Sequence, residues 1–372
     1  MCELNFTEVL NQHSVKSTTY STTLVKVIIG GKPAPPLVEV KTVCIDEDSC
    51  GQRVDNFLMR HLKGVPKTHV YRIIRSGEVR VNKGRVSADT RLASGDVVRI
   101  PPVRISERVA EKEQAMASLV ATSAPAREFV VLMEDDHLIA INKPAGVAVH
   151  GGSGVSFGVI EQLRMARPQA KFLELVHRLD RETSGILLVA KKRSALKHLQ
   201  DQFRERQTGK TYLAMVRGQW SAKLKVLDKP LHKYLLEGHD AQAGERRVRV
   251  VSRDDPDGMP SVTLVKVRHA SPEYSMLEVT IKTGRTHQIR VHLASEAHPI
   301  LGDDKYGDFD LNKKLAKATS HLSLKRMFLH AWRLQFNHPL TAERLELRAE
   351  LPPELNQLVA ATWPNATTPT SP

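Results

Sequence analysis

Short runs of strand-forming residues recur through most of the chain, and they limit its possible folds more than any other feature. Between Phe129 and Leu351 these runs are separated by turn residues, and only one helix is clearly marked, by apolar residues at 196, 199 and 203. Many strands with few helices indicate an α+β domain built on a mixed or antiparallel sheet rather than regular βαβ units. The runs that we predict as strands are 137–142, 186–190, 211–217, 261–267, 276–281 and 345–347.

Five ionisable side chains stand directly before the predicted strand at 186–190, which is an uninterrupted apolar run. A short turn that leads into a buried strand is both rigid and accessible, and a reactive side chain needs both properties. Asp180 is therefore a candidate catalytic carboxylate, although an aspartate that only caps a turn would produce the same charge pattern. The five residues are His177, Arg178, Asp180, Arg181 and Glu182.

A smaller module precedes this domain, at 51–108. Two apolar helical faces are followed by an alternating strand, by a turn at 82–84 that suits a hairpin, and by a closing strand at 96–100. These patterns predict two short helices and a small sheet. The first helical face consists of Val54, Phe57, Leu58 and Leu62, and the second of Val70, Ile73 and Ile74.

The positive charge of the chain is concentrated in this module. The whole sequence has 55 Lys and Arg against 41 Asp and Glu, which gives a formal net charge of +14. The stretch 51–108 contains 13 basic and 5 acidic residues, so it carries more than half of the excess. Such a balance favours a polyanionic partner, mainly nucleic acid. The side chains that we expect to contact phosphates are Lys67, Arg72, Arg75, Arg80, Lys83 and Arg85.

The other segments carry no signal for a folded domain. We expect 1–50 to be a poorly ordered extension, 109–128 a linker and 365–372 a disordered tail. No apolar stretch is long enough for a transmembrane helix, and no targeting signal is evident. The three cysteines form no C-x-x-C pair and the sixteen histidines no H-E-x-x-H motif, so we expect a cytoplasmic protein without a metal site.

Two polar pairs late in the sequence have ordinary structural interpretations. His287 and His292 are five residues apart, which does not place them on one face of a helix, and we interpret them as structural or phosphate-facing. Asp303 and Asp304 precede a lysine, and we interpret them as an acidic turn rather than a cation site.

Several segments of the sequence resemble known protein families. R-S-G-E-V-R-V-N-K-G at 75–84 resembles the hallmark of the S4 RNA-binding domain. H-R-L-D-R-E-T-S-G at 177–185, K-T-Y-L-A at 210–214 and G-R-T-H-Q-I-R at 284–290 together resemble the RluA-type family of RNA pseudouridine synthases. V-A-V-H-G-G at 147–152 and H-P-I-L-G-D-D-K-Y-G at 298–307 are also similar to segments of that family. The resemblance implies a pseudouridine synthase domain at 129–364 behind an S4 module.

The resemblance also implies a reaction and a role for each site residue. Converting uridine to pseudouridine replaces the bond from ribose to uracil N1 by a bond to C5, without redox change or phosphoryl transfer, so it requires no metal or cofactor. Asp180 corresponds to the family's catalytic carboxylate, which either bonds to the substrate or removes a proton from the sugar. Arg290 corresponds to the guanidinium that orients this carboxylate through paired hydrogen bonds. Tyr212 corresponds to the tyrosine that stacks on the uracil and is a candidate base for the C5 proton. Arg178 corresponds to the arginine that fills the space left by the flipped nucleotide.

The partner implied by the resemblance is large-subunit (23S) rRNA, free or in an assembly intermediate, bound by a monomer. Two other interpretations stay open on the residues alone. A non-catalytic RNA-binding or ribosome-assembly factor would keep the basic module and tolerate loss of Asp180. A glycosidase-like enzyme would use Asp180 and Glu182 as a carboxylate pair, although side chains two residues apart diverge on a strand or a helix. The sequence does not indicate which uridines are modified.

Overall fold

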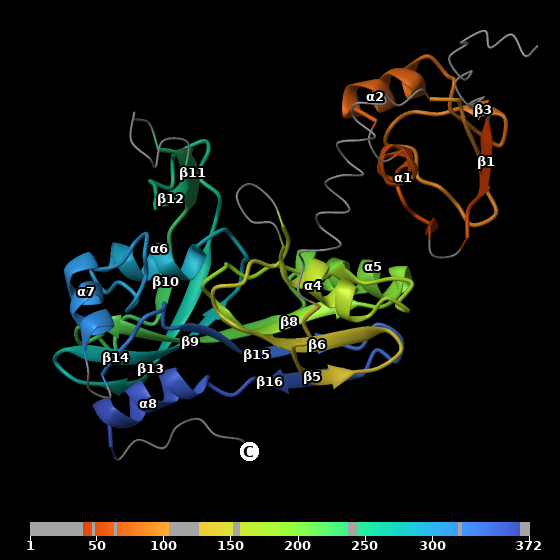
Figure 1. Ribbon diagram of the computed structural model, residues 1–372. Coiled ribbons are helices and arrows are strands. Elements are labelled where there is room, and N and C mark those ends of the chain that lie inside the picture. Colours follow the sequence, from red (N-terminus) through yellow and green to blue (C-terminus); the bar gives the residue numbers. More distant parts are fainter. Residues whose placement is uncertain are drawn as a thin grey trace, which may run out of the picture. The chain divides into compact units, whose positions relative to one another are not determined.

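The computed structural model of the chain describes residues 40–46, 49–62, 65–103, 126–151, 157–236, 245–318 and 322–364. The extension up to residue 39, most of the expected linker and the tail at 365–372 lie outside these described residues. The described segments form a small N-terminal module and a larger domain (Figure 1).

The small module contains two helices and a four-stranded sheet, which confirms the two predicted helices. Helix α1 is Val54–His61 and α2 is Lys67–Arg75. Their apolar faces pack on one side of a sheet with the strand order β1-β4-β2-β3. The strands are β1 (Lys41–Cys44), β2 (Arg80–Val81), β3 (Gly84–Arg85) and β4 (Val97–Ile100).

The module extends beyond the N-terminal boundary that we predict at residue 51, because β1 precedes it in the same sheet. This strand pairs antiparallel with β4 along its whole length, and Ile45, which follows it, is 2% exposed within the module's core. The residues of β1 do not reveal a strand, because β1 lies at the edge of the sheet and its side chains are mostly exposed. An edge strand held by backbone hydrogen bonds needs no hydrophobic alternation.

The predicted hairpin at 82–84 is confirmed, and it has a two-residue turn. Asn82 (φ 49°) and Lys83 (φ 68°) both adopt positive φ between the paired residues Val81 and Gly84. Positive φ at both central positions is the type I′ geometry, whose twist matches that of the two strands. The turn presents the Lys83 side chain at the exposed tip.

The larger domain is built on a ten-stranded sheet, as expected for a mixed, mainly antiparallel architecture. Its main order is β10-β13-β14-β9-β15-β8-β6-β5, and β16 pairs with β15 and β7 with β8. All six strands predicted from the sequence are present in it. The strands are β5 (Val130–Glu134), β6 (Leu138–Lys143), β7 (Glu174–Leu175), β8 (Ser184–Ala190), β9 (Gly209–Arg217), β10 (Val226–Asp228), β13 (Val262–Ala270), β14 (Tyr274–Ile281), β15 (Leu329–Asn337) and β16 (Arg344–Arg348).

The sheet consists of two antiparallel halves that meet at one parallel contact, between β8 and β15. The paired residues are Ser184 with His330 and Gly185 with Ala331. Gly185 has φ 111°, and a Cβ atom added to it would lie 2.3 Å from the Ala331 carbonyl oxygen. Only glycine permits both this backbone conformation and this approach. The two halves therefore meet directly after the predicted catalytic turn.

Helices cover both faces of the sheet. On β6 and β8 the buried residues alternate, so that one set packs against α4 (Val159–Ala166) and the other against α5 (Arg193–Arg204), the helix predicted from the sequence. In the other half, α6 (Gln288–Ser295) and α8 (Pro353–Thr362) contribute to one large cluster with β9 and β14. Each fully buried Leu, Ile or Phe in these clusters contributes roughly 1.5–3 kcal/mol.

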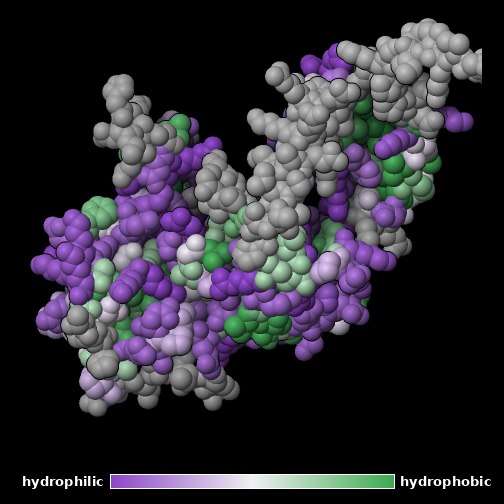
Figure 2. Space-filling view, in the orientation of Figure 1, coloured by the Kyte–Doolittle hydropathy of each residue, from purple (hydrophilic) through white to green (hydrophobic). Residues whose placement is uncertain are grey.

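A separate hairpin of β11 (Leu231–Leu235) and β12 (Arg246–Val250) projects from the larger domain (Figure 1). It is held by a small cluster of Leu231, Val248 and Val291. Hydrophilic residues cover most of this hairpin and helix α7 (Phe309–Lys317), as Figure 2 shows. Among the described residues, no helix is long and apolar enough to span a membrane.

Candidate active site

Asp180 lies in the loop between β7 and β8, where its backbone is fixed and its carboxylate is accessible. The neighbouring Leu179 is buried in the cluster that α4 forms with the sheet. The Thr183 backbone N–H donates a hydrogen bond to the Asp180 carbonyl oxygen (3.2 Å), which closes the loop just before β8. The Asp180 side chain remains 29% exposed. A rigid backbone beneath a reachable carboxylate is what a catalytic acidic residue requires.

His177 anchors the start of this loop. The Leu188 backbone N–H donates to His177 Nε2 (3.1 Å), and the imidazole stacks on Phe203 of α5 at 4.6 Å between ring centroids. Burial lowers the pKa of His177 to about 3, so the ring stays neutral and Nε2 can accept this hydrogen bond. The histidine of the H-R-L-D segment therefore supports the loop and does not reach the substrate space.

Lys143 anchors the other side of the loop. It is fully buried at the end of β6, and its Nζ donates to the carbonyl oxygens of Pro144 and Val147 (2.8 Å each) and of Arg181 (3.0 Å). The Gly146 N–H donates to the same Arg181 oxygen (2.9 Å). Burial lowers the pKa of Lys143 to about 7. Sequence reasoning missed this lysine, since nothing in its position indicates that it is buried.

Arg290, on α6, reaches Asp180 but is held mainly by Asp303. The Arg290 Nη1 atom is 3.5 Å from Asp180 Oδ2. The paired hydrogen bonds that we expected between these two residues are instead made to Asp303, by Nε (2.7 Å) and Nη2 (2.6 Å), and Nη2 also donates to Asp304 (3.0 Å). The interpretation of Asp303 and Asp304 as only an acidic turn was incomplete, because this turn supplies the buried partner of Arg290.

The ion pair between Arg290 and Asp303 is almost completely removed from solvent, with side chains 3% and 1% exposed. Burial alone would lower the pKa of Arg290, but the Asp303 hydrogen bonds and the nearby carboxylates raise it above its usual value. Burial would likewise raise the pKa of Asp303, but Arg290 and the backbone N–H groups of Lys305 and Tyr306 lower it. Both groups are therefore charged, and a fixed positive charge faces Asp180.

Tyr212 lies on β9 and lines the same cavity as Asp180. Burial, and secondarily the Asp180 charge, raise the pKa of Tyr212 well above its usual value. The phenol is therefore neutral at neutral pH. A neutral, half-buried ring on a strand is well placed to stack on a planar base, whereas ionising it to act as a base would be costly.

His287 also faces Asp180, although we had interpreted it as structural or phosphate-facing. Its Nε2 atom is 3.9 Å from Asp180 Oδ2, and its Nδ1 atom is 2.8 Å from the Tyr306 hydroxyl. Its companion His292 is fully buried and contacts Thr263 Oγ1 (2.9 Å) and a backbone carbonyl, which is a structural role. The G-R-T-H segment was the one signal that could have drawn attention to His287.

The Asp180 side chain lines two cavities, of about 90 and 250 Å³, which share several residues. Both are lined by Arg178, Leu179, Asp180 and His287, and the smaller is also lined by Tyr212 and Arg290. The Arg178 side chain is exposed and makes no hydrogen bond or ion pair within the part of the chain that the structure describes. The structure thus brings the four predicted residues of this site to one place.

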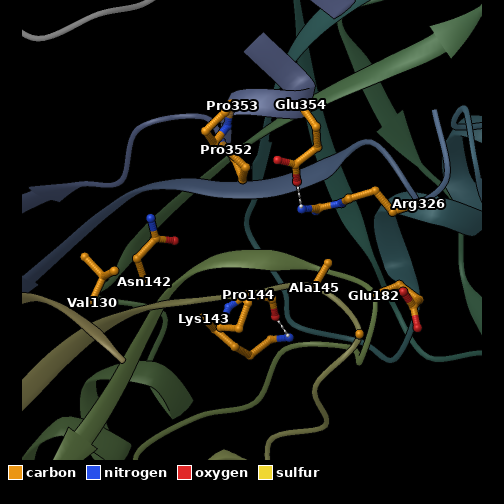
Figure 3. A pocket seen from close by; sticks show the side chains of 11 residues that line it. Val130, Asn142, Lys143, Pro144, Ala145, Glu182, Arg326, Pro352, Pro353 and Glu354 are labelled. Atoms are coloured by element: carbon orange, nitrogen blue, oxygen red, sulfur yellow. Dashed lines mark hydrogen bonds and ion pairs between the residues drawn. The ribbon is translucent and has the colours of Figure 1, made fainter. Parts of the chain in front are cut away.

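Glu182 belongs to a different cavity, of about 470 Å³, lined by β6 and the start of α8. Figure 3 shows this cavity with the Asn142 amide and the ion pair between Arg326 and Glu354 at its wall. The Glu182 carboxylate pairs with Arg181 (2.9 Å). Because Asp180 and Glu182 line different cavities, they do not form the carboxylate pair of a glycosidase.

In the small module, five of the six predicted phosphate contacts have exposed side chains, namely Lys67, Arg72, Arg75, Lys83 and Arg85. Arg80 is half-buried and donates to the Gly77 carbonyl oxygen (2.7 Å), so part of its role is to hold the turn after α2. The Arg85 side chain crosses Gly77 at the end of α2. This crossing places a hairpin arginine beside the helix that carries Lys67, Arg72 and Arg75.

One cluster of metal-binding side chain types occurs among the described residues, at His232, Asp255 and Asp257. The potential ligand atoms lie within 4.8 Å of one another. None of these residues lines the cavities around Asp180. The sequence did not suggest this grouping, because a turn of the chain between β12 and β13 brings the aspartates back to β11.

Comparisons with known proteins agree with this geometry. Residues 137–295 match the family model described as RNA pseudouridylate synthase, and residues 52–98 match the S4 domain. The solved structure of human RNA pseudouridylate synthase domain containing 4 is similar with a TM-score of 0.50 and 26% identity, covering 67% of this chain and 96% of that one.

Curated relatives match most of the chain. Ribosomal large subunit pseudouridine synthase C of Pasteurella multocida is 50% identical over 322 residues, which are 87% of this chain and 94% of that protein. The protein of the same name from Escherichia coli K12 is 52% identical over 312 residues, 84% of this chain and 93% of that protein. The chain therefore belongs to the RNA pseudouridylate synthase family.

Proposed function

We propose that the protein is an RNA pseudouridine synthase that isomerises specific uridines of large-subunit (23S) rRNA, with Asp180 as its catalytic carboxylate. The relatives that it matches over most of its length carry the name of this activity. The single observation that carries the assignment of Asp180 is its accessible carboxylate beside the buried Arg290 guanidinium, at the entrance of a cavity lined by Tyr212.

The reaction breaks the bond between ribose C1′ and uracil N1 and forms a bond between C1′ and C5. The proton on C5 is lost and N1 gains one, so the product is an isomer of the substrate. Asp180 either bonds to the substrate or takes a proton from its sugar. Arg290, held by Asp303, places a fixed positive charge beside Asp180 and orients its carboxylate. Tyr212 stacks on the uracil as a neutral phenol.

The target nucleotide has to leave the RNA stack to reach Asp180, at a cost of a few kcal/mol. Arg178 is the side chain that occupies the vacated space, since it lines both cavities and has no other partner among the described residues. The S4 module binds RNA phosphates through its exposed lysines and arginines, so affinity falls steeply with salt. The enzyme acts in the cytoplasm as a monomer, on free rRNA or on an assembly intermediate.

Asp180→Asn tests the proposal, with Glu182→Gln as the matched control. Asn keeps the size of Asp180 but removes its charge, so release of tritium from [5-³H]uridine-labelled rRNA should slow by at least ~10³-fold. Binding of rRNA should change far less, because phosphate contacts elsewhere dominate it. Glu182→Gln should keep near wild-type rates, since Glu182 lines another cavity.

Tritium release by the Asn variant at a near wild-type rate would remove Asp180 from the mechanism. If the wild-type protein bound rRNA but released no tritium, it would be a non-catalytic binding factor. Mapping of pseudouridines in 23S rRNA from a deletion strain identifies the modified positions.

A further inference from the structure

His287 has an uncommon backbone conformation, and its ring is held by a contact with Tyr306. It precedes α6 in the left-handed conformation (φ 53°), which non-glycine residues rarely adopt. Its side chain is 14% exposed and lines both cavities at Asp180. A polar side chain held in an uncommon conformation beside a reactive carboxylate suggests a role in the reaction.

Tyr306 fixes which ring nitrogen of His287 carries the proton. The Tyr306 hydroxyl accepts a hydrogen bond from the Val248 N–H (3.0 Å) and lies 2.8 Å from His287 Nδ1. Burial raises the pKa of Tyr306 to about 12, so the hydroxyl keeps its proton. Within the described residues, Nδ1 is the one acceptor available to that proton. This contact favours the neutral tautomer that carries its hydrogen on Nε2, which faces Asp180.

Burial also lowers the pKa of His287, and the charges around it partly cancel. Asp180 and Asp303 favour the protonated ring, whereas Arg290 and Lys305 oppose it. A neutral ring with one donor at Nε2 is the form consistent with these neighbours.

The gap between His287 Nε2 and Asp180 Oδ2 is 3.9 Å, which is too long for a hydrogen bond. One oxygen atom at about 2.8 Å from each would bridge the two groups. That oxygen has to accept from Nε2–H and donate to the carboxylate. A uracil carbonyl only accepts, and would face the carboxylate as a second acceptor. The uracil N3–H only donates, and would face Nε2–H. A hydroxyl group satisfies both sides.

We propose that His287 and Asp180 together bind the ribose 2′-hydroxyl of the target nucleotide, and that His287 thereby helps the enzyme to select RNA. This rests on the proposed function. Within an RNA strand the 3′- and 5′-oxygens are esterified to phosphate, so the 2′-hydroxyl is the free hydroxyl of each nucleotide. It is attached to the carbon next to C1′, where the reaction occurs, and its presence distinguishes RNA from DNA.

The test uses two short RNA substrates that differ only at the target uridine, which carries either a 2′-hydroxyl or a 2′-hydrogen. The measured quantity is the ratio of kcat/KM for the two substrates, determined for wild-type protein and for two variants. His287→Asn tolerates the left-handed backbone and can still bond to Tyr306, but it has no group at the position of Nε2. His287→Gln is longer and can place an amide N–H near that position. Any intrinsic effect of the 2′ substituent on the chemistry is common to all three proteins and cancels in the comparison.

We expect the wild-type ratio to exceed the His287→Asn ratio about three- to tenfold, which corresponds to one neutral hydrogen bond, and the Gln variant to recover part of it. Tyr306→Phe, which frees the ring to change tautomer, should also reduce the ratio. Equal ratios for wild type and His287→Asn, with both folded by circular dichroism, would overturn the proposal. Failure of the wild-type protein to convert the 2′-hydroxyl substrate would instead overturn the proposed function.

Discussion

Asp303→Asn should lower the free energy of unfolding of the larger domain substantially, although the substitution barely changes the size of the side chain. Asp303 accepts four hydrogen bonds, two from the Arg290 guanidinium and two from the backbone N–H groups of Lys305 and Tyr306. In the Asn variant the amide oxygen can keep the three bonds made to Oδ1, but the NH₂ group faces Arg290 Nε–H, donor against donor. The charge that neutralises a guanidinium only 3% exposed is also lost. Breaking a buried pair by removing one partner costs about 3–5 kcal/mol.

Urea unfolding followed by tryptophan fluorescence measures this loss. The three tryptophans of the chain, Trp220, Trp332 and Trp363, all lie in the larger domain, so the signal does not report on the small module. For a slope of roughly 1–3 kcal/mol per molar urea, the midpoint should fall by at least ~1 M.

Asp304→Asn is the matched control, because Asp304 contacts the same Arg290 nitrogen but is 53% exposed. It should cost no more than about 1 kcal/mol. Equal midpoint shifts for the two variants would show that burial does not set the strength of this ion pair.

Three further outcomes are expected. Arg178→Ala should slow single-turnover conversion without changing the urea midpoint, and the loss should shrink on RNA whose target uridine is already unstacked; equal losses on both substrates would remove its space-filling role. Lowering the pH from 6.5 to 4 should cost the domain about 3 kcal/mol through His330, because burial lowers the pKa of His330 from 6.5 to about 4 and the unfolded chain takes up the proton first. His177, whose pKa burial also lowers, contributes over the same range, so His330→Gln should make the urea midpoint depend less steeply on pH without abolishing the dependence, and an unchanged slope would contradict the assignment. Gly185→Ala should be much more destabilising than Gly146→Ala, since both glycines have positive φ but only Gly185 lacks space for a Cβ atom; similar thermal midpoints for the two variants would argue against the close contact of β8 and β15.

The parts of the fold that the sequence predicted are those in which apolar residues form either an unbroken short run or a regular period. Strand β8 is continuously apolar and α5 has one apolar face, so both are evident from the residues alone. Helix α6 was not predicted, because its residues from Gln288 to Leu293 are all buried and include arginine and histidine, which leaves no amphipathic pattern. Strand β1 was missed because its side chains are mostly exposed, and β12 because three of its five residues are arginines; backbone hydrogen bonds hold both strands in place.

For the site, sequence motifs indicated which residues matter but not how they are paired. Asp180 and Arg290 are 110 positions apart, and only their resemblance to a family suggested that they meet. That the paired hydrogen bonds of Arg290 go to Asp303 depends on burial, which an acidic pair in a sequence does not reveal. The orientation of the His287 ring toward Asp180 likewise depends on the left-handed backbone of His287 and on its contact with the Tyr306 hydroxyl. Neither feature has a local sequence pattern.

The active site lies where the two halves of the sheet meet, at the short parallel contact between β8 and β15. Asp180 enters from the β8 half, whereas Tyr212 and Arg290 belong to the other half. A small change of twist at this contact would alter the spacing of the reacting groups. Apolar side chains reach across the contact on both faces, with Leu187 and Ala331 in one cluster and Leu188 and Leu334 in another. Substitutions at Leu187, Ala331, Leu188 or Leu334 would therefore be the first choice for changing the rate of catalysis without altering any residue that contacts the substrate.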